Sequence, residues 1–144
     1  SLVEELGIKH RVVFCGVRND VNVVLRAADI VVVSSRTEAF PNVILEAMAT
    51  GLCVVSTEVG SVGEMVEAGR SAMVVPAGDE TALRNAIEGL AANDAMRREF
   101  GARGREIVEA RFRIETMCVA REALFEELLA PRHRETPLRT RESA

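Results

Sequence analysis

The sequence has no long hydrophobic run and no excess of positive charge. No apolar stretch approaches the roughly 18 residues that a membrane-spanning helix needs, and the first residues, SLVEELGIKH, lack the organisation of a secretion signal. The formal charge of −4 and the pI near 5.3 remove the usual electrostatic reason to expect nucleic acid or an anionic membrane as a partner. We therefore expect a cytoplasmic domain with no transmembrane segment and no nucleic-acid partner.

Cysteine is also scarce. Cys15, Cys53 and Cys118 are odd in number and far apart in the sequence, and each lies in an apolar segment. This distribution fits neither a disulfide framework nor a metal-ligand spacing. We expect three buried, reduced thiols and no metal site.

Four short apolar runs predict β-strands at residues 12–15, 30–34, 52–56 and 72–75. Each run is rich in Val and mostly continuous rather than alternating, which is typical of parallel strands covered by helices on both faces. Right-handed connections between such strands give a doubly wound, Rossmann-like α/β fold, in which ligands bind at the carboxyl ends of the strands. The 144 residues, 48% of them hydrophobic, suffice for one domain with its own core.

Helix signals lie between and after these strands. Asp20 can cap a helix that runs to about Ala28, Pro41 suits the first turn of a second helix, and Gly51 follows that helix at the position of a left-handed cap. From Thr81 onward, apolar residues at helical spacing predict a run of helices. The charged, proline-containing residues 131–144 predict a disordered tail.

Glu46 stands in the middle of the second helix, with apolar residues on both sides in sequence. An ionised carboxylate buried there without a partner would cost several kcal/mol. One interpretation places Glu46 on a narrow solvated stripe with Asn42 and Thr50. In the other, the stripe lines a cleft, where the carboxylate accepts hydrogen bonds from the paired hydroxyls of a ribose.

Glu38 precedes Glu46 by eight positions and lies in the loop after the strand that ends near Ser34. It either complements the dipole of the following helix or contacts a ligand at the strand ends. The helix that begins near Pro41 offers unpaired amides and a favourable dipole, which together suit a diphosphate. Arg36, in the same loop, either reaches a phosphate or stays solvated.

The segment EAFPNVILEAMATG, with its two glutamates separated by seven residues, is followed by an apolar strand and by VGSVGEMVEAG. Together with VVFCG, DVNVVLRAADIVVVSS and AMVVPAGD, it strongly resembles the donor-binding domain of the group 1 (family 4) retaining glycosyltransferases. That domain is the C-terminal half of enzymes with the GT-B fold. The resemblance covers roughly residues 12–129, although Ala39 stands where the family usually has glycine.

The resemblance implies a role for each part of this segment. Glu38, the candidate catalytic-site residue, would contact hydroxyls of the donor sugar, with a role as covalent nucleophile as the less favoured alternative. Glu46 would hold the ribose hydroxyls. Other residues would contact the rest of the donor: the nucleobase at Gly16, Val17 and Arg18; the sugar and phosphate at the backbone of Ala39, Phe40, Pro41 and Asn42; and the diphosphate at Val43.

The resemblance also implies parts that this sequence does not contain. The family's donor domain begins with two more strands, which carry a basic phosphate-binding pair. In the family's sheet, these two strands lie side by side between the strands that correspond to residues 12–15 and 30–34. A separate N-terminal domain binds the acceptor. We therefore expect residues 1–130 to be a partial nucleotide-sugar-binding domain with C-terminal helices, truncated at its N-terminus and inactive when isolated.

The expected function is transfer of a hexose from a UDP-sugar or GDP-sugar to an acceptor hydroxyl, with retention and without a cofactor. The resemblance places this reaction in polysaccharide, glycolipid or cell-envelope glycan synthesis. The acceptor, a glycan or lipid-linked glycan, would bind through the missing N-terminal domain, which could also bring the enzyme to the inner membrane. A non-catalytic nucleotide-sugar-binding module and a GT-B sugar-nucleotide epimerase are the alternatives.

Overall fold

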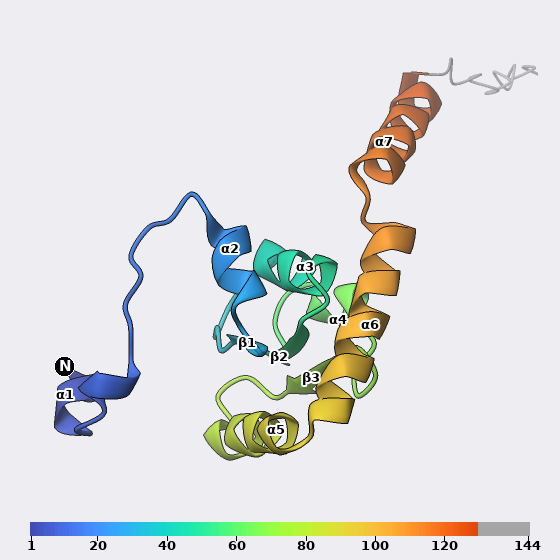
Figure 1. Cartoon of the computed structure of the whole chain (residues 1–144). Coiled ribbons are helices and arrows are strands. Elements are labelled where there is room, and N and C mark those ends of the chain that lie inside the picture. Colours follow the sequence, from blue (N-terminus) through green and yellow to red (C-terminus); the bar gives the residue numbers. More distant parts are fainter. Residues whose placement is uncertain (130–144) are drawn as a thin grey trace, which may run out of the picture.

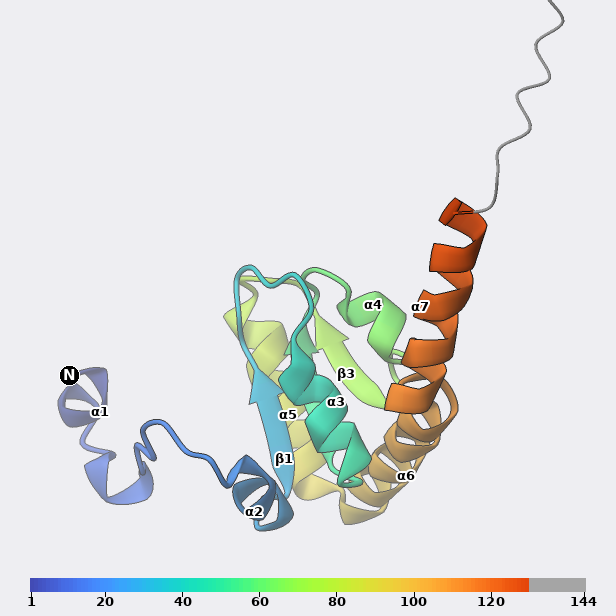
Figure 2. The same ribbon diagram turned by 90° about the horizontal axis from the view of Figure 1, so that it is seen from above.

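Three parallel strands form the centre of the computed structural model, which describes residues 1–129. They are β1 (Ile30–Val33), β2 (Cys53–Thr57) and β3 (Ala72–Val75), in the order β1-β2-β3. Helices cover both faces of this sheet (Figures 1 and 2). The structure therefore confirms the α/β fold class and three of the four expected strands. The predicted tail at residues 131–144 lies outside the described residues.

The fourth expected strand, at residues 12–15, is not formed. A short helix α1 (Leu2–Glu5) and a 3₁₀ turn η1 (Lys9–Arg11) precede it, and the segment lies as an isolated ribbon apart from the sheet before the chain reaches α2 (Val21–Arg26) (Figure 1). Val13 is 84% exposed and Phe14 is 81% exposed. A strand requires hydrogen bonds to a neighbouring strand, and within residues 1–129 no strand lies beside this segment.

Helices α2 (Val21–Arg26), α3 (Asn42–Ala49) and α4 (Val62–Met65) connect or precede the strands. Pro41 is the N-cap of α3, where its missing N–H leaves no helical hydrogen bond unmade, and Gly51 just beyond the helix has a φ of 77°. Ile44, Ala47 and Met48 of α3 are fully buried because their spacing of three and four places them on one face. Both boundary signals read from the sequence are thereby confirmed.

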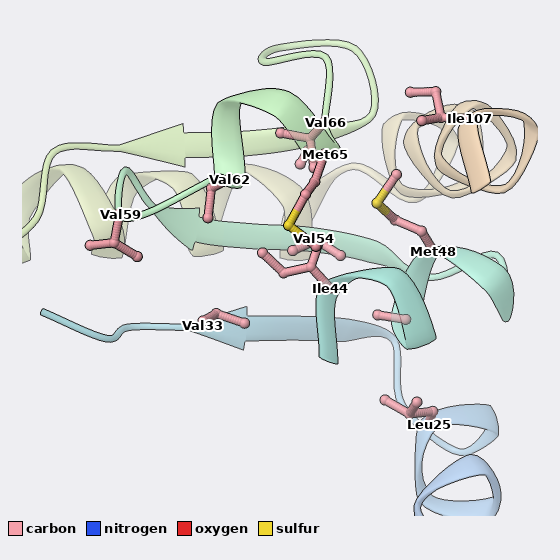
Figure 3. Packing of buried hydrophobic residues seen from close by; sticks show 12 residues of the cluster. Leu25, Val33, Ile44, Met48, Val54, Val59, Val62, Met65, Val66 and Ile107 are labelled. Carbon is pink, nitrogen blue, oxygen red and sulfur yellow. The ribbon is translucent and has the colours of Figure 1, made fainter. Parts of the chain in front are cut away.

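The main hydrophobic core lies between the sheet and α3, α4 and α6 (Asp94–Arg111). Figure 3 shows Ile44, Val54 and Met65 meeting in this layer, and all three side chains are 0% exposed. Burying one such side chain stabilises the fold by about 1.5–3 kcal/mol. Helix α3 and the loops at its two ends are therefore held on a rigid sheet.

Helix α5 (Glu80–Ala92) covers the other face of the sheet and is followed by α6. Asp79 caps α5 by accepting a hydrogen bond from the Ala82 amide at 2.8 Å, and Asn93 caps α6 by accepting one from the Met96 amide at 3.0 Å. Helix α6 crosses the end of α3 so closely that a methyl group at Gly101 would overlap the backbone of Gly51.

Helix α7 (Ile114–Leu129) extends from the packed part of the chain and contains no buried residue.

The expectation that all three cysteines are buried is wrong for two of them. Cys53 of β2 is buried, and burial raises the pKa of its thiol, but Cys15 and Cys118 are exposed because their segments have no cover within residues 1–129. None of the helices in residues 1–129 has the length and apolar character needed to cross a membrane.

Candidate functional site

The loops that follow β1 and β2 meet at the carboxyl ends of these strands. Thr57, the last residue of β2, donates its hydroxyl hydrogen to the carbonyl oxygen of Ser35 at 2.6 Å and lies 3.3 Å from that of Val33. Farther along, the Ser61 amide donates to the carbonyl oxygen of Ala39 at 3.1 Å. The loop at residues 34–41 is thus fixed to the end of β2 on one side and to the turn after β2 on the other.

Gly60 allows the turn after β2 to lie directly against the backbone of the loop at residues 34–41. A Cβ atom at Gly60 would lie 2.5 Å from the carbonyl oxygen of Ala39 and closer still to that of Glu38. Its φ of 50° also lies in the left-handed region, which favours glycine. The turn after β2 therefore contacts the backbone of Glu38 directly, a relation that the sequence analysis missed.

Glu38 is exposed at the surface of this loop. Its Oε1 atom accepts a hydrogen bond from the Ser35 hydroxyl at 2.8 Å. Within residues 1–129 no side chain or backbone group donates to the other oxygen, Oε2. A ligand hydroxyl can reach that oxygen without displacing a protein partner.

The N-terminus of α3 follows Glu38 by only a few residues. Its first two amides, those of Asn42 and Val43, have no acceptor within the helix. Asn42 is exposed, Val43 is half-buried and Pro41 is buried. Phe40, 42% exposed, leaves part of its ring at the surface just ahead of the helix. The backbone here can accept an anion, because amides and helix dipole both favour negative charge.

Glu46 lies on the exposed side of α3, one turn after these amides. Glu46 lines a hollow of about 580 Å³ between α2 and α3. The accessible stripe agrees with both interpretations of Glu46, and the hollow beside it provides the room that the ligand interpretation needs. The other residues that line it are Asn19, Val21, Asn22, Leu25, Ala49 and Thr50.

Asn19 and Asn22, whose side chains end in amide groups, were not expected at this site. Their signal in the sequence was weak, because two asparagines near a predicted helix start are ordinary capping residues. In the structure both asparagines line the same hollow as Glu46. They add neutral amide donors and acceptors to a lining that otherwise consists of apolar residues, Thr50 and Glu46.

The predicted nucleobase segment leads directly into this hollow. Gly16 has a φ of 62°, and Val17 is fully exposed. Arg18 binds the carboxylate of Asp20 through two hydrogen bonds of 2.6 and 2.8 Å. Asp20 is the N-cap of α2, but the ion pair occupies its side chain, so the expected capping hydrogen bond is not made.

Arg36 lies apart from the hollow beside Glu46. It lines a second hollow, of about 260 Å³, between the carboxyl ends of the strands and the start of α5. Asp79 and Glu80 also line this space, so its charge is mixed. Among residues 1–129, no group of three or more His, Cys, Asp or Glu side chains is arranged to hold a metal ion.

Comparison with known proteins gives consistent matches. Residues 1–93 match the protein family described as Glycosyl transferases group 1. The chain is 32% identical over 129 residues to N-acetyl-alpha-D-glucosaminyl L-malate synthase from Bacillus anthracis, covering 90% of this chain and 34% of that protein. The chain thus spans about a third of the length of this curated relative.

Solved structures agree with this match. Sucrose-phosphate synthase from Thermosynechococcus elongatus superposes with a TM-score of 0.83 and 36% identity, over 90% of this chain and 33% of that one. HepE from Anabaena, solved in complex with UDP-glucose, superposes with a TM-score of 0.79 and 28% identity, over 85% of this chain and 35% of that one. These neighbours are GT-B glycosyltransferases.

Proposed function

This chain belongs to the group 1 glycosyltransferases, and from that premise we propose that residues 1–129 form most of the donor-binding part of a retaining hexosyltransferase. The donor is a UDP-sugar or GDP-sugar, and the acceptor is a hydroxyl group of a glycan or lipid-linked glycan. The reaction uses no cofactor and no metal. It belongs to the synthesis of a polysaccharide, glycolipid or cell-envelope glycan.

The arrangement of Glu38 and Glu46 around the start of α3 carries this proposal. Glu38 lies before the helix, at the carboxyl end of β1, and Glu46 lies one turn inside it beside a hollow. The free amides of Asn42 and Val43 lie between them in the chain. This order, carboxylate, anion site, carboxylate, matches the order sugar, diphosphate, ribose in a nucleotide sugar.

Each group has a physical reason for its role. The Glu46 carboxylate accepts hydrogen bonds from the two ribose hydroxyls, each worth about 1.5–3 kcal/mol for a charged acceptor. The base lies against residues 16–18, beside the mouth of the same hollow. The amides of α3 donate to the diphosphate, and Glu38 accepts from sugar hydroxyls through its free Oε2 atom.

The chemical step forms negative charge on the leaving diphosphate. The dipole and amides of α3 stabilise part of that charge, since they are already oriented toward it. Two carboxylates nearby oppose it, so further cationic groups are needed. The resemblance assigns that role to a basic pair of the family's donor domain. It also implies a separate domain that binds the acceptor and brings the enzyme to the inner membrane. Support for donor binding comes from HepE, which was solved with UDP and UDP-glucose.

The experiment compares Glu38→Ala with the wild type in the full-length protein encoded by the gene. A panel of UDP- and GDP-sugars is incubated with hexoses and alkyl glycosides, and release of nucleoside diphosphate and glycoside product is measured. Glu38→Ala should lower the transfer rate by roughly 10- to 100-fold. It should barely change the affinity for free UDP or GDP, because these products lack the sugar that Glu38 contacts.

Glu88→Ala, on the exposed side of α5, is the matched control and should leave both quantities unchanged. Equal losses of transfer and of diphosphate binding in Glu38→Ala would show that the assignment of Glu38 to the sugar is wrong. Donor binding without transfer or hydrolysis in the wild type would point to a binding module instead of an enzyme.

A further inference from the structure

Ser35 makes the one hydrogen bond that orients the Glu38 carboxylate within residues 1–129. The Ser35 hydroxyl donates to Oε1 of Glu38 at 2.8 Å. Ser35 is half-buried, whereas Glu38 is exposed. The more buried member of the pair therefore holds the more exposed one.

Ser35 is itself anchored to the sheet. Its carbonyl oxygen accepts the hydroxyl hydrogen of Thr57 at 2.6 Å. Thr57 is the last residue of β2 and is only 4% exposed. The backbone unit that carries the Ser35 hydroxyl is thereby tied to the central strand of the sheet.

The backbone of Glu38 is restrained from its other side as well. The carbonyl oxygen of Ala39 accepts a hydrogen bond from the Ser61 amide at 3.1 Å, and Gly60 packs against the Glu38–Ala39 backbone with no room for a side chain. With the main chain fixed, the remaining freedom of Glu38 is in its side-chain torsions. The hydrogen bond from Ser35 is what restricts those torsions.

From this chain of contacts we propose that Ser35 is a positioning residue for the Glu38 carboxylate, and that Thr57 holds Ser35 in place. The inference rests on the proposed function, in which Glu38 contacts the donor sugar. Because Oε1 is engaged by Ser35, the carboxylate presents Oε2 to the sugar in a fixed direction. Orientation of this kind matters for rate, since a carboxylate that samples several rotamers spends less time in the productive one.

The test uses Ser35→Ala and Ser35→Thr in the full-length protein, with the same donor panel and acceptors. Ser35→Ala should lower kcat for transfer by roughly 5- to 30-fold and change the Kd for free UDP or GDP by less than about twofold. Ser35→Thr keeps the hydroxyl and should restore kcat to within about threefold of the wild type. Ser34→Ala, at the neighbouring exposed serine, is the control and should behave as wild type.

A purely structural role for Ser35 would not give this pattern. Loss of folding would lower the fraction of active protein and the binding of free diphosphate together, and the threonine variant would not rescue it selectively. Thermal unfolding of each variant checks the fold. If Ser35→Ala is too unstable to assay, Ser35→Cys replaces it, because a thiol has similar size and donates a weaker hydrogen bond; it should then give an intermediate kcat.

A double variant separates this inference from the proposed function. If Ser35 acts through Glu38, adding Ser35→Ala to Glu38→Ala should lower kcat by less than about twofold further. Wild-type kcat in Ser35→Ala, or a full additional loss in the double variant, would overturn the positioning role while leaving the Glu38 assignment intact. Wild-type transfer by Glu38→Ala would instead overturn the proposed role of Glu38, and the positioning role with it.

Discussion

Residues 12–15 and strand β1 are two Val-rich runs of similar composition, VVFC and IVVV, with different structures. Strand β1 pairs with β2 along its whole length, with Ile30 opposite Cys53 and Val33 opposite Ser56. Residues 12–15 pair with nothing in the described part of the chain and expose Phe14 to 81%. Apolar composition alone therefore does not make a strand, because its hydrogen bonds must come from a neighbour.

Helices α6 and α7 also differ in how much of their surface the rest of the fold covers. Helix α6 buries Phe100 and Ile107 against the rest of the fold, whereas α7 buries no residue. Both are nevertheless helical, since a helix forms its backbone hydrogen bonds within itself. The packed residues 21–112 thus bury side chains that the flanking segments leave exposed. Of the two flanking segments, only the expected strand at residues 12–15 fails to form, because a strand needs a neighbour and a helix does not.

The largest expected effect is a difference in the free energy of unfolding between truncating a buried side chain and truncating an exposed one. In the 144-residue chain, Ile44→Ala should lower the free energy of unfolding by about 2–5 kcal/mol, because it opens a cavity at a fully buried site. Phe14→Ala removes a larger side chain yet should change it by less than about 0.5 kcal/mol. Urea denaturation followed by circular dichroism measures both. Equal losses would mean that residues 12–15 are covered in solution.

A smaller effect concerns an ion pair in the packed region. Arg103 of α6 donates hydrogen bonds of 2.9 and 2.6 Å to Glu67, which precedes β3. These hydrogen bonds hold the pKa of the Glu67 carboxyl below its ordinary value. A lowered pKa in the folded state contributes stability above the pKa of the unfolded state, and that contribution is lost as pH falls through the folded-state pKa.

Glu67→Gln should therefore reduce the difference in unfolding free energy between pH 7 and pH 3, and Arg103→Met should reduce it in the same way. Denaturation of the three proteins across this pH range tests the prediction. If both variants keep the full pH dependence of the wild type, the pair does not link α6 to the segment before β3 in solution.

The difference between packed and uncovered segments also explains which elements could be predicted from the sequence. The three paired strands, the start of α3 at Pro41 and its end before Gly51 depend on local signals, and the structure confirms them. The strand at residues 12–15 and the burial of Cys15 and Cys118 depend on neighbours that the sequence does not specify. Those expectations were wrong for that reason.

The candidate site divides in the same way. Glu46 stands out because a carboxylate in the middle of an apolar helix is unusual. Glu38 stands out by its place after the strand that ends near Ser34 and by its spacing from Glu46, since a carboxylate ahead of a helix is ordinary. The restraints on Glu38 from Ser35, Thr57 and Gly60 were missed, since two of them come from the next strand and turn. The serine three residues before Glu38 was a readable signal, but that spacing is also common in ordinary turns and caps.

The central claim is that α3 carries the nucleotide half of a donor site, and Glu46 tests it most directly. The measurement is calorimetric titration of UDP and GDP into the full-length protein and its Glu46→Gln variant, with Glu88→Gln as control. We predict that Glu46→Gln weakens binding of the preferred diphosphate by about 1.5–3 kcal/mol, or roughly 10- to 150-fold in Kd, and leaves thermal unfolding unchanged. An unchanged Kd in Glu46→Gln would contradict the claim.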